Sequence, residues 1–160
     1  MNSINPSIQR WVKASMMKQL KDLLKGQPTF IEGMDRQTSR VPNHFEVRLD
    51  GPYFKPCGTR GEWRAFIEVN ILVNTTRDEK NIYLQENMKG LATQALSRAF
   101  CIYRTGNEGK EDSDDGSLFG TMLLDAKDEI KVSEFGMIDT NTEVFQAVVE
   151  AHYEMYFTTF

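Results

Sequence analysis

Residues 60–75 show the clearest pattern of hydrophobic and polar positions in the chain, because apolar and polar side chains alternate there almost without interruption. A period of two over this length predicts a long β-strand with one buried face. Six apolar residues share one parity of the segment: Trp63, Ala65, Ile67, Val69, Ile71 and Val73. The other parity carries charges and amides, but also Phe66 and Leu72. This second face could be exposed to solvent, cover a ligand or contact another copy of the chain.

Two other segments have the apolar spacing of amphipathic helices. Residues 6–25 predict the first helix, with Asn5 suited to its N-cap and Pro6 to its first turn. A second helix is predicted where apolar side chains recur at helical spacing from Leu84 to Ala99. Each helix should bury one face against the strands.

The remaining apolar segments predict further strands. Residues 44–50 alternate cleanly, and a turn at Asp50-Gly51-Pro52 is expected to end that strand. Paired with 62–74, this strand should form a large antiparallel hairpin, preceded by a short strand within 28–34. Four more strands are predicted after the second helix, at 99–104, 117–125, 129–138 and 142–160.

This order of elements predicts an α+β fold, in which one mostly antiparallel, mixed β-sheet has a long hairpin and two helices packed on one face. The 160 residues are best accounted for as one domain, 1–160. No apolar run approaches the roughly 20 residues that a membrane helix needs. The N-terminus also lacks the basic and apolar stretches of a secretory signal, so we expect an intracellular origin and no membrane partner.

The composition agrees with an ordinary globular protein, at 40% hydrophobic and 26% charged residues. Cys57 and Cys101 have no CxxC spacing, and disulfides are rare inside cells, so both are expected to be reduced structural thiols. Cys57, between a proline and a glycine, would suit an exposed thiol, but no histidine partner for a nucleophile is recognisable.

The net charge of −4 is concentrated in residues 105–116, so the rest of the chain is formally neutral. That segment opposes Lys110 with five carboxylates: Glu108, Glu111, Asp112, Asp114 and Asp115. No basic stripe suited to a phosphate backbone occurs, which argues against sequence-specific DNA binding.

Candidate chemistry is sparse in the sequence. The acidic segment fails the EF-hand spacing, because Gly116 stands at the third ligand position. His44 and His152 are isolated, each on the polar parity of a predicted strand, and no hydrolase, metalloprotease or nucleotide-binding motif occurs. We therefore predict no catalytic residue, no cofactor and no metal site, with the acidic segment as a solvated loop.

Three stretches carry a resemblance to a known family: FEVRLDGPYFKP (45–56), WRAFIEVNILVNT (63–75) and NIYLQENMKGLATQAL (81–96). Together with the N-terminal helix, over about residues 6–104, they resemble the tail terminator (tail-to-head joining) proteins of long-tailed double-stranded DNA bacteriophages. The resemblance implies a structural virion protein that is not an enzyme. Such subunits form a ring, commonly a hexamer, that caps the completed tail tube, stops its polymerisation and joins it to the head connector. DNA passes through the lumen of the ring.

This resemblance suggests roles for two groups of residues. The second parity of the long strand would suit a subunit interface, with two apolar anchors in a polar surround: Glu62, Arg64, Phe66, Glu68, Asn70 and Leu72. Alternatively, Phe66 and Leu72 lie beneath the chain's own loops. The acidic loop would face the lumen and repel DNA, or else lie on the outer surface.

Two other functions remain open on sequence alone. The first is another neck or head-completion ring protein of a phage. The second is a small cytosolic enzyme or ligand-binding domain that uses the sheet face as a pocket, which carboxylates or histidines converging on one cavity would favour.

Overall fold

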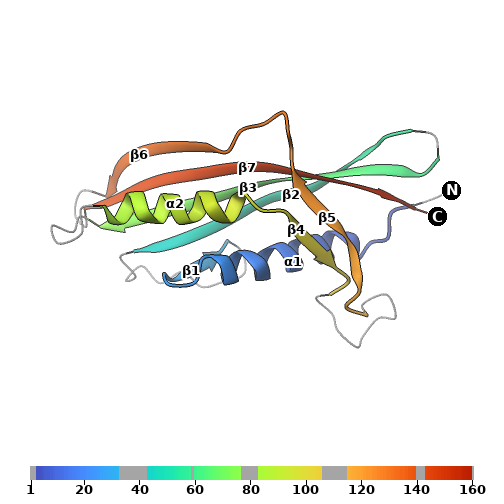
Figure 1. Cartoon of the computed structure of the whole chain (residues 1–160), viewed down its shortest axis with the longest axis horizontal. Helices are drawn as coiled ribbons and strands as arrows, with labels where there is room; N and C mark the ends of the chain where they lie inside the picture. Colours follow the sequence, from blue (N-terminus) through green and yellow to red (C-terminus); the bar gives the residue numbers. More distant parts are fainter. Residues whose placement is uncertain are drawn as a thin grey trace.

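The protein is described here by a computed structural model, which covers residues 3–32, 43–58, 60–76, 83–105, 115–139 and 143–159 (Figure 1). In chain order its elements are α1 (Ile8–Leu23), β1 (Thr29–Ile31), β2 (His44–Pro56), β3 (Glu62–Thr76), α2 (Leu84–Leu96), β4 (Phe100–Tyr103), β5 (Leu118–Leu124), β6 (Lys131–Asp139) and β7 (Val144–Thr158). The predicted α+β fold class is confirmed. None of the helices described is long and apolar enough to cross a membrane.

The strands form one mixed sheet in the order β1-β2-β3-β7-β5-β4, with β6 also paired to β7. Only β1 and β2 run parallel; every other described pair is antiparallel. The long strand β7 has two partners along one edge. β6 pairs with the first part of β7, up to Glu150, and β5 pairs with the second part, at Glu154. Its other side pairs with β3 along the full length of both strands.

The turn predicted at Asp50-Gly51-Pro52 is wrong, because β2 continues through these residues to Pro56. Asp50 lies opposite Glu68 and Tyr53 opposite Phe66, so β2 contains one more residue than β3 between these pairs. A β-bulge accommodates the extra residue without ending the strand. The hairpin instead turns after Pro56 and before Glu62.

Gly51→Ala is expected to destabilise the fold by roughly 1–3 kcal/mol. Gly51 has a φ of +119°, and a Cβ there would lie 3.1 Å from the carbonyl oxygen of Phe66. The matched control is Gly90→Ala, in the exposed part of α2 with no atom within 4 Å of an added Cβ, which should stabilise by about 0.5–1 kcal/mol. Urea-induced unfolding of both variants tests the bulge, and a neutral Gly51→Ala would contradict it.

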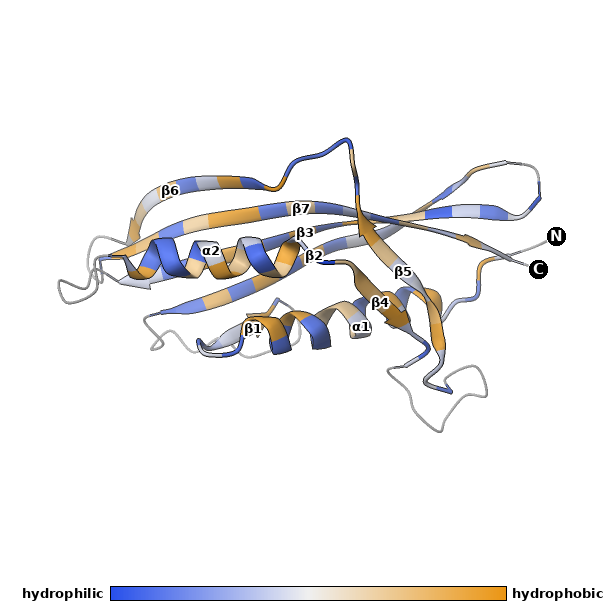
Figure 2. Cartoon of the chain, in the orientation of Figure 1, coloured by the Kyte–Doolittle hydropathy of each residue, from blue (hydrophilic) through white to orange (hydrophobic). Residues whose placement is uncertain are grey.

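Both helices pack on the same face of the sheet. A single cluster of buried residues joins both helices to the odd-numbered positions of β3 and β7, from Ala65 to Val73 and from Ala147 to Phe157. Tyr153 is the largest of the fully buried side chains, and its hydroxyl donates a hydrogen bond to the carbonyl of Leu96 at the end of α2. The neighbouring strands β4 and β5 are largely apolar (Figure 2).

The helix ends differ slightly from the prediction. The first helix begins at Ile8, where the side chain of Asn5 accepts the backbone N–H of Ser7 at 2.9 Å. The second helix ends at Leu96, since the backbone N–H and hydroxyl of Ser97 both turn back to the carbonyl of Gln94. Ala99 therefore lies beyond the helix and is exposed, contrary to its predicted place on the apolar face.

Candidate functional site

The face of β2, β3 and β7 that points away from the helices, here called the open face, carries the candidate functional residues. It contains the six residues proposed from the sequence as a subunit interface: Glu62, Arg64, Phe66, Glu68, Asn70 and Leu72. Glu62 is exposed, the next four are half-buried, and Leu72 is only 4% exposed. Leu72 is thus buried although it lies on the polar parity of the strand.

An apolar group lies near the hairpin end of the open face. We define the open-face patch as Tyr53, Phe66, Leu123 and Tyr156, which strand register brings together from four strands. The rings of Tyr53 and Phe66 lie 5.6 Å apart. Apart from the half-buried Phe66, the members of this patch are at least half exposed, and Tyr156 reaches 64%. Exposed apolar groups of this kind are typical of interaction surfaces.

Arg64 lies beside this patch and is paired inside the chain. Its guanidinium contacts Glu154 at 2.6 Å and Asp125 at 3.3 Å, and it also lies 4.9 Å from the centre of the Phe66 ring. The hydrogen bond to Glu154 raises the pKa of Arg64 above its usual value. Arg64 therefore forms a polar border of the patch, with its charge paired to carboxylates of the same chain.

A cluster of two carboxylates and an imidazole follows along the same face. Glu68 of β3 lies opposite His152 of β7, and Glu150 is two residues before His152 on the same side of its strand. The His152 Nε2 atom is 2.9 Å from Glu150 Oε1, and the Asn70 amide donates to Glu68 Oε1 at 3.4 Å. A hydrogen bond from Glu68 to Glu150, together with burial, raises the pKa of Glu68; the same bond lowers the pKa of Glu150. The two carboxyl groups therefore interact directly with each other.

A hollow of about 330 Å³ adjoins this cluster. Its lining includes Glu68 and His152, together with Asp50, Asp125 and Asp128. The sequence did not predict this convergence, because Glu68 is more than 80 residues from the other two members of the cluster. The alternation of Glu150 and His152 was visible, but the register that brings Glu68 opposite them was not.

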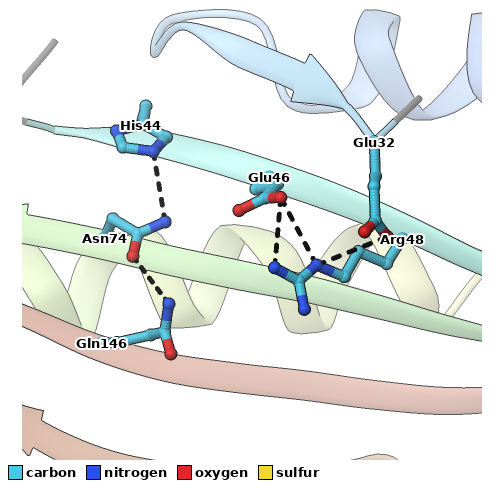
Figure 3. Close-up of polar contacts among 6 residues, drawn as sticks. All are labelled: Glu32, His44, Glu46, Arg48, Asn74 and Gln146. Carbon is cyan, nitrogen blue, oxygen red and sulfur yellow. Dashed lines mark hydrogen bonds and ion pairs between the residues drawn. The ribbon is translucent and has the colours of Figure 1, made fainter. Parts of the chain in front are cut away.

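The far end of the open face holds a buried chain of hydrogen bonds (Figure 3). The Asn74 amide donates to His44 Nε2 at 3.3 Å, and Gln146 donates to Asn74 Oδ1 at 3.0 Å. His44 and Asn74 are 8% and 3% exposed, and the His44 ring lies edge-on to Phe30 at 5.5 Å. His44 is therefore a structural histidine, buried although it lies on the polar parity of its strand.

Asn74→Ala is expected to lower the free energy of unfolding by roughly 1–3 kcal/mol, because it removes the partner of the buried His44 and of the half-buried Gln146 on the two neighbouring strands. The measurement is urea-induced unfolding monitored by circular dichroism. Glu62→Ala, an exposed change in the same strand, is the control and should remain within about 0.5 kcal/mol of the parent. Equal stabilities for the two variants would contradict the structural role of the chain.

A second apolar group lies on β6, which pairs only with β7 among the described strands. We define the β6 patch as Val132, Phe135, Met137 and Ile138, all at least 45% exposed, with Phe135 at 61%. Apolar and polar residues are mixed along this strand (Figure 2). A long, apolar, unpaired strand edge is a surface that readily accepts another chain.

The acidic segment predicted as a loop falls largely outside the described residues, as do four of its carboxylates: Glu108, Glu111, Asp112 and Asp114. Asp115 is described and exposed. Its carboxylate accepts hydrogen bonds from the hydroxyl and the backbone N–H of Ser117, at 2.5 and 2.9 Å, which lower the pKa of Asp115. Cys57 and Cys101 are half-buried free thiols.

Comparison with known proteins gives a fold but no family. No protein-family model and no curated protein matches the chain. Of 29 matching solved chains, one, named only by a sequence identifier, is 11% identical with a TM-score of 0.56, over 92% of this chain and 95% of its own. A second, described as the virion of a native gene transfer agent particle, is 10% identical with a TM-score of 0.49, over 91% and 95%. The first likeness supports the α+β fold alone.

Proposed function

We propose that this protein is a tail terminator, a structural virion protein that assembles into a ring, commonly of six copies. The ring caps the completed tail tube, stops its polymerisation and offers a docking surface to the head connector or neck protein. DNA passes through the lumen without sequence-specific binding, and no reaction or cofactor is involved. The protein would be assembled in the host cytoplasm and reside at the tail and neck of the particle.

One observation carries this proposal: the molecule has two unlike exposed apolar surfaces, the open-face patch and the β6 patch. A ring made by head-to-tail association needs two different, complementary surfaces on each subunit, whereas a two-fold dimer uses one surface twice. The two patches lie on different parts of the sheet, so both can be occupied at once. The sequence resemblance over about residues 6–104 supplies the identity of the ring.

The interface proposed from the sequence is refined by the burial of its members. Phe66 belongs to the open-face patch, with Arg64 and Glu154 as its paired polar border. Leu72 is buried and should contribute to folding, not to assembly. We therefore place the first lateral contact at the hairpin end of the open face and the second along β6.

In this proposal the acidic loop faces the lumen, where negative charge lets DNA slide. Replacing Glu111, Asp112, Asp114 and Asp115 by their amides should leave ring assembly unchanged but slow DNA ejection from particles. Ejection kinetics from particles carrying the variant provide the measurement. Ejection at the parental rate would contradict the proposed role of the acidic loop in repelling DNA.

Two other functions compete with this one. The convergence of Glu68, Glu150 and His152 beside a hollow specifically favours a ligand-binding domain. A different neck or head-completion protein would form its ring through the same two patches, but at another position between the head and the tail.

Addition of the protein to growing tail tubes tests the proposal. A tail tube protein is allowed to polymerise with and without a stoichiometric amount of the purified protein, and tubes are measured by electron microscopy. A terminator should arrest elongation and leave a ring at one tube end. A ring-forming protein that leaves tube length unchanged would instead belong to another level of the neck, and a monomer without effect would favour the ligand-binding function.

A further inference from the structure

We propose that Glu68, Glu150 and His152 form a binding site for a divalent first-row transition metal ion on the open face. The two carboxylates and the imidazole each offer one ligand atom, and these atoms all lie within 4.8 Å of one another. All three ligands come from one chain, so the site is complete without assembly. The proposal is thus independent of the proposed ring function.

The backbone holds the three side chains in place. Glu68 and His152 are directly opposite in the β3–β7 ladder, which pairs along the full length of both strands in the centre of the sheet. Glu150 projects from the same side two residues earlier on β7. Ligands carried by rigid, adjacent strands need little reorganisation to converge on an ion.

The concentration of carboxylates around the cluster also favours a bound cation. The ligand atoms of Glu68 and Glu150 lie within 4.8 Å of each other, so two carboxylates are concentrated at this point of the open face. Asp50 lies opposite Glu68 in the β2–β3 ladder and adds negative charge. The basic groups facing the pair are the His152 ring and Lys131, which lies opposite Glu150 on β6.

Two arginines of the open face are already engaged by other carboxylates. Arg48 pairs with Glu46 at 3.3 Å and with Glu32 at 3.5 Å (Figure 3). Arg64 pairs with Glu154 and Asp125. A bound divalent ion would supply the charge that these arginines do not.

The ligand types indicate the class of ion. An imidazole nitrogen with two carboxylate oxygens suits Mn²⁺, Co²⁺ or Zn²⁺, whereas Ca²⁺ and Mg²⁺ prefer all-oxygen sites. Three protein ligands leave coordination positions for water. The adjoining hollow of about 330 Å³, lined by Glu68 and His152, provides the space for that water and a path for the ion.

Binding of Mn²⁺ tests the site, because the two cysteine thiols bind this ion only weakly. Free Mn²⁺ is measured by electron paramagnetic resonance during titration of the full chain, with the protein mass recorded in the same sample. One equivalent should bind saturably. Each of Glu68→Gln, Glu150→Gln and His152→Asn should weaken binding at least about 10-fold, the loss that follows removal of even an outer-shell partner.

Glu46→Gln is the control, because this carboxylate lies on the same face but outside the cluster, and it should leave Mn²⁺ binding unchanged. Circular dichroism and thermal unfolding without metal establish that each variant is folded. Absence of saturable binding would overturn the proposal. Equal binding by the parent and all three folded ligand variants would do the same. Neither result depends on whether rings form.

Discussion

Variants of the two patches are expected to form a dimer when mixed, although neither forms a ring alone. Phe135→Asp with Ile138→Asp disables the β6 patch, and Leu123→Asp with Tyr156→Asp disables the open-face patch. Each head-to-tail contact joins one patch of each kind, so the mixture retains a single usable contact. Light scattering coupled to size exclusion should show two monomers before mixing and a one-to-one dimer afterwards. These four side chains are exposed, so the fold should be preserved.

Tyr83→Asp provides the control, because it charges an exposed aromatic residue outside both patches, and this variant should still form rings. Rings formed by either patch variant alone would move the interface elsewhere. If one variant forms a dimer by itself and mixing produces no dimer that contains both variants, the contact is two-fold. That result would exclude the head-to-tail arrangement.

Leu72→Ala is expected to lower the free energy of unfolding by about 2–4 kcal/mol, the usual cost of truncating a buried leucine. Leu72 is 4% exposed even though it shares a strand parity with Arg64 and Asn70. Phe66→Ala should cost less stability, because Phe66 is only half-buried, and it should weaken assembly instead. Urea-induced unfolding measures the effect on stability, and particle mass as a function of concentration measures the effect on assembly.

The opposite results for these two variants would change which residues are assigned to the interface. A stable Leu72→Ala variant that fails to assemble would restore Leu72 as an interface anchor. An unstable Phe66→Ala variant would assign Phe66 to the fold and leave the lateral contact to its more exposed neighbours Tyr53, Leu123 and Tyr156.

The sequence predicted most of the fold because its strands and helices have distinct hydrophobic periods. The buried parity of β3, from Ala65 to Val73, and that of β7 were both readable from alternation. The bulge at Gly51 was not, since a glycine followed by proline suggests a turn when the partner strand is unknown. Only the register between β2 and β3 shows that the strand continues past it.

The candidate sites depended on information that a single sequence lacks. Phe135 and Ile138 resemble core residues until the topology places β6 at a sheet edge. Glu68 meets Glu150 and His152 only through the pairing of strands far apart in the chain. Periodicity therefore identified the faces of the strands, whereas neighbour relations across the sheet determined what those faces contain.

The most direct test of the ring is the mass of the purified protein across concentration, by light scattering coupled to size exclusion, with negative-stain images of each peak. The same images are taken after addition of tail tubes. We expect a closed ring of fixed copy number, with a central hole wide enough for duplex DNA, in free solution or at tube ends. A single-chain mass at every concentration, with no ring on any tube end, would contradict it.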